Sequence, residues 1–205
     1  MKTIEYFYSV LNGDKTLNFK HKEWLVIAIS DLKSSDILYK NELYPQAVYF
    51  LQQSVEKSCK YIGLTFNIIQ VNELYRKVGH EPERIFEEVY NSEIMKAIML
   101  NLCAYEQMKE QAQATEVIKY VEDGLRMLND FKIQNIVKSF MIQMNLSLAV
   151  SGVEANSRYP DNRQNTSPDM LYKKGVKLVD NLPFFLDIQS VNLDILKNLR
   201  KEMMI

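Results

Sequence analysis

The stretch YPQAVYFLQQSVEKSCK at residues 44–60 decides the fold class of this chain. A proline stands second in it, and proline fits the first turn of a helix because its missing N–H has no partner to lose there. Apolar residues then recur every three or four positions, which places them on one side of an α-helix. They are Val48, Leu51, Val55, Cys59 and Ile62. The stretch therefore predicts a helix from residue 45 to residue 62, with Gly63 as its C-terminal cap.

The opposite side of this helix carries polar residues, namely Gln52, Gln53, Glu56, Lys57 and Lys60. Glu56 precedes Lys60 by one helical turn, in the orientation that favours helix formation. Charged helix faces are usually solvated, so the simplest interpretation leaves Glu56 and Lys60 outside the core that holds Val55 and Cys59. The alternative is a groove that binds a phosphate or a partner.

The rest of the chain predicts further helices and no sheet. Six glycines and five prolines are few for 205 residues, as expected where long helices dominate. Helical spacing of apolar residues predicts helices over residues 24–39, 83–131 (one or two), 169–182 and 191–203, and an inward stripe at Val137, Met141, Met144 and Leu148. The main loop lies at residues 156–168. We expect an all-α, up-and-down bundle of about six to eight helices over residues 21–205, with residues 1–20 as an N-terminal arm or short helix.

Composition limits the kinds of site that this chain can hold. A net charge of −1 gives no overall attraction for nucleic-acid backbones, although a local basic patch is compatible with it. Two cysteines and two histidines are too few for a zinc or di-iron site, so we expect no metal and no cofactor. No apolar run approaches the roughly 20 residues of a membrane span, so we expect a cytoplasmic protein. The ten methionines fit core packing or a dimer seam.

Three sequence elements, in this order, resemble those of the HEPN domain family. Residues 44–60 resemble its signature helix: a tyrosine, an alanine, an aromatic residue, two glutamines, Glu-Lys and a further lysine. Gly79-His80, with Ile85 and Phe86 downstream, is similar to the mid-chain histidine and apolar pair of the family. Residues 157–161 (Ser-Arg-Tyr-Pro-Asp) resemble its Arg-Tyr-Pro element. The resemblance extends from residue 24 to about residue 181.

The resemblance implies an up-and-down helical bundle, frequent homodimerisation, and either nucleotide binding or RNA cleavage. Cleaving members carry an arginine, four to six further residues, and then a histidine that handles the proton of a 2′-hydroxyl. In this chain no histidine follows Arg126, Arg158 or Arg163 at that spacing, and Arg76 and His80 have only three residues between them. We therefore expect no catalytic residues.

The candidate ligand-binding residues come from the same three elements. They are Gln53, Lys57, Lys60, His80, Arg158 and Tyr159. The planar fork of Arg158 suits a phosphate, but the alternative is that it caps a helix while the Tyr159 ring packs under the bundle. His80 is more often a helix-end residue than a catalyst, because spacing identifies no partner carboxylate.

Three functions compete on this sequence. The leading one is a non-catalytic homodimer that holds a nucleotide or RNA phosphate, beside a separate nucleotidyltransferase; it requires Arg158 and the Lys57/Lys60 face to converge. The second is a structural or protein-interaction dimer of a toxin-antitoxin or stress module, which requires an apolar surface elsewhere. The third is a divergent, metal-independent ribonuclease, which requires His80 to face Arg76 or Arg158.

Overall fold

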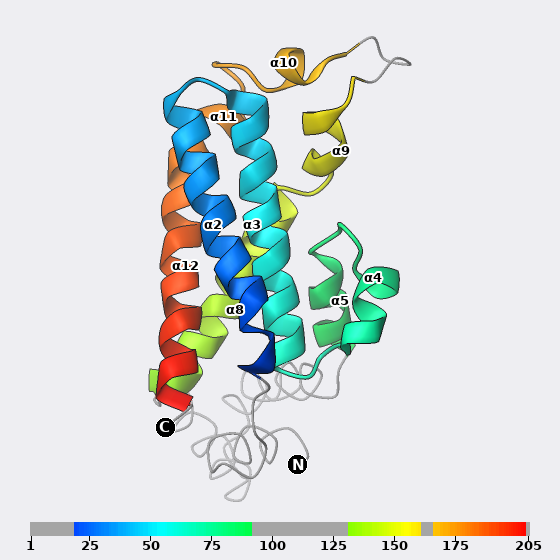
Figure 1. The fold of residues 1–205 in the computed structure, drawn as a ribbon, viewed down its shortest axis with the longest axis vertical. Helices are drawn as coiled ribbons and strands as arrows, with labels where there is room; N and C mark the ends of the chain where they lie inside the picture. Colours follow the sequence, from blue (N-terminus) through cyan, green and yellow to red (C-terminus); the bar gives the residue numbers. More distant parts are fainter. Residues whose placement is uncertain (1–18, 92–130, 161–165, 204–205) are drawn as a thin grey trace, which may run out of the picture.

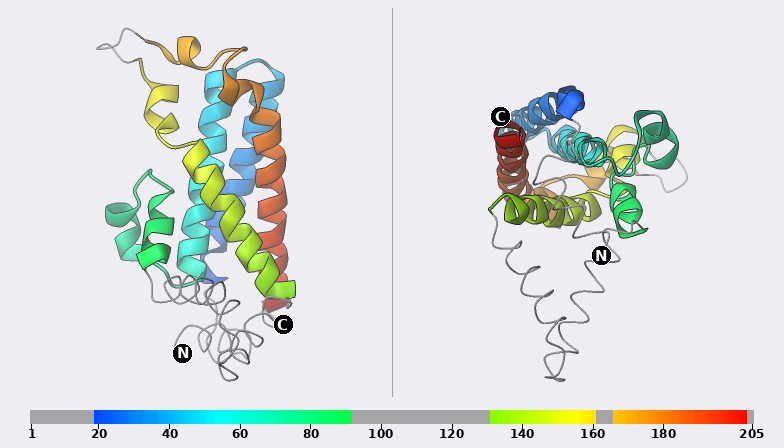
Figure 2. Two further views of the ribbon diagram at one scale, coloured as in Figure 1. Left: turned by 180° about the vertical axis from the view of Figure 1, so that it is seen from behind. Right: turned by 90° about the horizontal axis from the view of Figure 1, so that it is seen from below.

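Four long helices form the body of the protein in the computed structural model, which describes residues 19–91, 131–160 and 166–203. They are α2 (Lys22–Lys40), α3 (Tyr44–Thr65), α8 (Phe131–Ala149) and α12 (Leu182–Met203). They run alternately up and down, and α3 lies between α2 and α8 while α12 closes the ring on the other side (Figures 1 and 2). The described residues contain no β-strand, so the predicted all-α bundle is confirmed.

Shorter helices surround the bundle. They are η1 (Phe19–His21), η2 (Val71–Glu73), α4 (Leu74–Lys77), α5 (Arg84–Asn91), α9 (Val153–Arg158), α10 (Pro168–Leu171) and α11 (Lys177–Asp180). Figure 1 shows α4, α5 and α9 on the same side of α3, and α5 and α9 pack directly on that helix. As a result, α3 is covered around most of its circumference.

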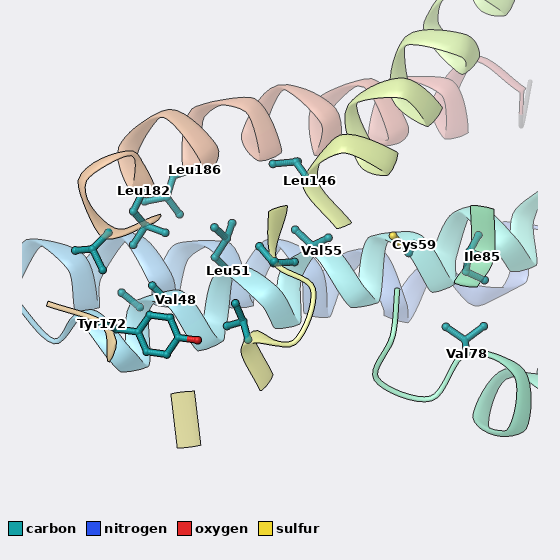
Figure 3. Close-up of a cluster of buried hydrophobic side chains, with 14 of the residues drawn as sticks. Val48, Leu51, Val55, Cys59, Val78, Ile85, Leu146, Tyr172, Leu182 and Leu186 are labelled. Atoms are coloured by element: carbon teal, nitrogen blue, oxygen red, sulfur yellow. The ribbon is translucent and has the colours of Figure 1, made fainter. Parts of the chain in front are cut away.

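The apolar side of α3 is the centre of the core, as the sequence predicts. Val48, Leu51, Val55 and Cys59 are fully buried. Figure 3 shows them against Leu146 of α8 and Leu182 and Leu186 of α12, with Tyr172, Val78 and Ile85 closing the cluster. The predicted first long helix at residues 24–39 is also present, since it corresponds to α2.

Gly63 does not cap α3, contrary to the sequence-based prediction. The helix continues to Thr65, and Gly63 is buried inside its last turn. A Cβ atom at this position would lie 2.7 Å from Ile85 Cδ1 and 3.0 Å from Ile69 Cγ2. The missing side chain therefore permits the close approach of the chain that carries Ile69 and Ile85.

The buried face of α8 was also predicted wrongly. Met141, Met144 and Leu148 are exposed, and the side chain of Val137 lies outside the described residues. The face that enters the core is half polar, and it consists of Ile136, Ser139, Gln143, Leu146 and Ser147, with Val150 buried just after the helix.

Hydrogen bonds explain how polar residues of α8 can lie in the core. Gln143 Nε2 donates to the Val55 carbonyl on α3 at 2.9 Å, and Ser139 Oγ donates to Asn192 Oδ1 on α12 at 2.7 Å. The amide of Asn192 in turn donates to Gln143 Oε1. Because each buried polar group has a partner, the usual cost of burying it is offset.

The C-terminal third also differs from the prediction in its boundaries. The single helix expected over residues 169–182 is instead α10 and α11, separated at Gly175, whose φ is +94°. The last helix begins at residue 182 and not at 191, with Pro183 in its first turn, where proline is tolerated. Within the expected loop at residues 156–168, the first three residues still belong to α9.

The N-terminal arm and most of the predicted helical region at residues 83–131 lie outside the described residues.

The close approach at Gly63 leads to a stability prediction. Gly63→Ala should lower the free energy of unfolding by about 1–3 kcal/mol, because the new methyl group overpacks the site against Ile85 and Ile69. Urea unfolding measures this loss. In an Ile85→Val background, which removes the nearest methyl group, the same change should cost less. Equal costs in both backgrounds would show that this contact is unimportant.

Candidate functional site

Glu56 lies in the interior of the protein, although the sequence predicted it on a solvated face. Its exposed fraction is 1%, and that of Lys60 is 8%. The apolar positions Val55 and Cys59 are buried as predicted, but burial continues round the helix to the polar side. The prediction failed because the segment containing α4 and α5 covers the side of α3 that it left to solvent.

Five side chains surround the Glu56 carboxylate. On Oε1, the Lys60 Nζ lies at 2.6 Å and the Lys57 Nζ at 3.4 Å. On Oε2, His80 Nδ1 lies at 3.2 Å, and the side-chain amides of Gln52 and Gln53 each donate at 3.4 Å. These six residues are called the Glu56 cluster. It unites four of the predicted candidates, namely Gln53, Lys57, Lys60 and His80.

The cluster keeps its central carboxylate ionised. Burial alone would raise the pKa of Glu56, but the charge of Lys57 and the hydrogen bonds from Lys60 and His80 outweigh it and hold this pKa below its ordinary value. Asp31 of α2 is also part of this electrostatic environment. Burial raises the pKa of Asp31, while the attraction of Lys57 opposes the rise.

The backbone before His80 directs the histidine towards α3. Gly79 follows α4 with φ +56°, a conformation that glycine adopts without strain, and its N–H donates to the Leu74 carbonyl at 3.0 Å. Val78 is buried in the core immediately before it. The Gln52 side chain then donates to the His80 carbonyl at 3.3 Å. His80 is therefore fixed by its backbone as well as by its ring.

The carboxylate partner of His80 was missed at the sequence level. Glu56 is 24 residues away, so no local spacing rule connects the two. One signal was available: the charged residues of the 22-residue helix α3 are confined to Glu56, Lys57 and Lys60. A solvated face would carry charge along its whole length, so this distribution is typical of a buried helix with one polar cluster.

The two lysines of the cluster differ in what they contact. The Lys60 ammonium lies 5.4 Å from the centre of the Trp24 ring on α2, in addition to its short bond to Glu56. Lys57 donates to Gln53 Oε1 and is farther from the carboxylate. Lys60 is thus held between α2 and α3, whereas Lys57 lies nearer the edge of the cluster.

Arg158 and Tyr159 lie near the N-terminal half of α3, where α9 packs on that helix. The Arg158 guanidinium lies 5.4 Å from the centre of the Tyr49 ring and 5.0 Å from that of Tyr159. Tyr49 precedes Gln53 by one turn and Lys57 by two turns of α3, a rise of about 12 Å from Tyr49 to Lys57. Tyr159 is 58% exposed, so its ring does not pack under the bundle.

Other reactive groups in the described part of the chain are less suited to chemistry. Burial raises the pKa of the Cys59 thiol far above its usual range, so this cysteine is a core residue and not a nucleophile. Across residues 19–91, 131–160 and 166–203, no three His, Cys, Asp or Glu side chains are grouped as metal ligands would be.

Among the same residues, no helix has the length and apolar character needed to cross a membrane.

Because Glu56 is buried, its substitution should destabilise the protein far more than the substitution of a glutamate on a solvated helix face would. Glu56→Ala should lower the free energy of unfolding by about 3–5 kcal/mol, because it leaves two lysines desolvated without their counter-charge. The matched control is Asp36→Ala, which removes an exposed i,i+4 partner of Lys40 and should cost about 0.3–0.5 kcal/mol. Thermal or urea unfolding distinguishes the two, and similar losses would contradict the buried position of Glu56.

Comparison with known proteins agrees with the sequence elements noted above. The HEPN domain model matches residues 21–172, a span that begins just before α2 and ends just after α10. It includes α3, His80 and Arg158. No curated protein and no solved structure matches the chain. Since the match covers well over half of the 205 residues, this chain belongs to the HEPN domain family.

Proposed function

We propose that this chain is a non-catalytic, cytoplasmic HEPN protein that binds a nucleotide through its phosphate on the side of α3 between Arg158 and the Glu56 cluster. The observation that carries the proposal is that Arg158 and Lys57, which are about 100 residues apart in sequence, both lie along α3. Arg158 stacks on Tyr49, and Lys57 and Gln53 lie one to two turns farther along the same helix.

The side chains at both ends suit a phosphate ester attached to a base. The Arg158 guanidinium lies against two tyrosine rings, and a planar guanidinium suits bidentate contact with a phosphate. The exposed Tyr159 ring offers a surface on which a base can stack. At the other end, Lys57 contributes an ammonium group and His80 an exposed imidazole.

The arrangement of the arginines supports a binding role over RNA cleavage. The cleavage motif of the family needs an arginine and a histidine that act together. Arg76 and Arg84 are each four residues from His80 in sequence. Arg76 is largely exposed, with its Nη2 3.8 Å from Glu73 Oε1, and Arg84 is paired with Glu81. The Arg158 guanidinium contacts the Tyr49 and Tyr159 rings. Among the described residues, His80 contacts the Glu56 carboxylate through its Nδ1.

The first test of the proposal is direct binding. Arg158→Ala should weaken binding of a nucleotide such as ATP by roughly 1–3 kcal/mol, since it removes a charge-assisted contact. Lys57→Met should weaken it by a similar amount while it keeps the aliphatic stem. Isothermal titration calorimetry, over a panel of mononucleotides and short RNAs, measures both effects.

The matched control for this test is Lys138→Met, which removes an exposed lysine of α8 and should leave nucleotide affinity unchanged. Thermal unfolding of each variant separates lost binding from lost structure. Unchanged affinity in both Arg158→Ala and Lys57→Met would refute the proposed site.

A second candidate function, a protein-interaction dimer of a toxin-antitoxin or stress module, is favoured by one observation. Met141, Met144 and Leu148 lie exposed along α8. The neighbouring exposed residues Asn145 and Ala149 are uncharged. Lys138 stands one turn before Met141, at the end of this uncharged stretch, and we propose homodimerisation through α8. A nucleotidyltransferase partner is compatible with either function, because both leave other surfaces available.

The dimer has its own test. The double substitution Met144→Glu and Leu148→Glu should convert a dimer into a monomer at micromolar concentration, because each buried, unpaired carboxylate costs several kcal/mol. Native mass spectrometry reports the stoichiometry and any nucleotide that co-purifies. The control, Val26→Glu, adds a charge to an exposed position of α2, across the ring from α8, and should leave the dimer intact. A dimer that survives the double substitution would exclude this face.

A further inference from the structure

The contact between His80 and Glu56 determines which nitrogen of the imidazole carries a proton. An ionised carboxylate can only accept hydrogen bonds. His80 Nδ1 lies 3.2 Å from Glu56 Oε2, so the hydrogen bond requires the proton on Nδ1. In the neutral ring, Nε2 is then the unprotonated nitrogen. It is the atom that gains or loses a proton.

The two members of this pair face different environments. The Glu56 side chain is 1% exposed and the His80 side chain is 59% exposed. The buried carboxylate is further fixed by Lys60, and the His80 backbone by Gln52. This is the general arrangement in which a carboxylate orients an imidazole through one nitrogen and leaves the other for a ligand. The His80 side chain is thus held at Nδ1 while more than half of it is exposed.

Within the part of the chain that the structure describes, charged groups lie near His80 on three segments, and Glu83 on the segment of His80 accepts a hydrogen bond from Ser151. On α3 they are Glu56, Lys57 and Lys60, and on α2 Asp31 interacts with both Glu56 and Lys57. On its own segment Glu81 is bonded to Arg84, and Glu73 is paired with Lys77 at 3.2 Å. Among these described carboxylates, Glu56 is the one hydrogen-bonded to the ring. The carboxylates of Glu81 and Glu73 are already paired with cations.

We infer that His80 Nε2 is the proton-exchanging atom of the phosphate site and takes up a proton when a terminal phosphomonoester binds. This inference rests on the proposed function and narrows its ligand class. The proton comes from solvent onto the Nε2 lone pair, and the resulting N–H donates to a phosphate oxygen; no covalent bond in the ligand changes. An imidazolium at this position lies between the Glu56 carboxylate and a phosphate that carries close to two negative charges. A phosphodiester carries one charge and stabilises the added proton less.

The first measurement is the tautomer of the histidine. The chain has two histidines, so His21→Gln leaves His80 as the single imidazole. Nitrogen-15 NMR of the neutral ring should show the proton on Nδ1. A proton on Nε2 would overturn the inference without affecting the proposed nucleotide site.

The second measurement counts protons during binding of AMP. Calorimetry in two buffers with different ionisation enthalpies should show net uptake near neutral pH, beyond any change in the ligand itself. The excess should disappear in His80→Gln, whose side-chain amide can still donate to Glu56 but cannot take up a proton. Because binding takes up a proton, the affinity of the wild type for AMP should also fall more steeply with rising pH than the affinity of the variant does. The difference is up to about tenfold per pH unit.

The possible outcomes separate the inference from the proposed function. Binding of AMP with equal proton uptake in the wild type and in His80→Gln overturns the inference and leaves the proposed function standing. Absence of AMP binding at every pH overturns both the proposed function and the ligand part of the inference. A dinucleotide without a terminal phosphate lacks the second negative charge of the phosphomonoester. It should therefore bind about tenfold more weakly than AMP. Equal affinities would exclude the phosphomonoester as the preferred class.

Discussion

A buried carboxylate in the central helix is the constraint on which much of this structure depends. Because α3 is covered on most sides, Glu56 has no access to bulk water, and an isolated ionised carboxylate there would be prohibitively costly. Its charge must be compensated by groups brought to it. Lys60 and Lys57 come from the same helix, but His80 comes from the segment between α4 and α5. The carboxylate thereby ties that segment to the bundle, together with the buried side chains of Val78 and Ile85.

Hydrogen bonds between buried polar side chains fix the bundle in a second way. Gln189 of α12 donates to Ser54 Oγ at 3.1 Å and to Ser58 Oγ at 2.9 Å, and Ser54 donates to the Ala28 carbonyl of α2 at 2.8 Å. With the Gln143 and Asn192 contacts, each long helix has at least one polar bond to another. Sliding one helix past its neighbour would leave such groups unpaired, which costs more than the bonds themselves contribute. These contacts therefore specify the register of helices whose apolar surfaces alone would permit several.

The success and failure of sequence-based reasoning follow from these polar contacts. Where burial follows apolar periodicity, as along α2 and the Val48 to Cys59 side of α3, the predicted helix and its inner face agree with the structure. On α8, Ser139 and Gln143 enter the core because α3 and α12 supply partners, and the methionines are left outside. A periodicity rule has no means of knowing those partners. For the same reason, the sequence-based prediction placed Glu56 in solvent. It identified six candidate site residues but not the contacts that bring four of them together at Glu56.

The gradient of exposure within the Glu56 cluster distinguishes residues that stabilise the fold from residues that can meet a ligand. The Lys60 side chain is 10% exposed and lies between the carboxylate and Trp24, so its contribution is to the packing of α2 on α3. Lys57 is 16% exposed and His80 is 59% exposed, yet both contact the same carboxylate. One buried charge thus orients two surface groups at a fixed separation, which reduces the entropy that each would otherwise lose when it binds a ligand. Since the carboxylate compensates the positive charge of Lys57, a ligand is recognised here by the direction of the donors more than by net charge, which fits a chain whose overall charge is −1.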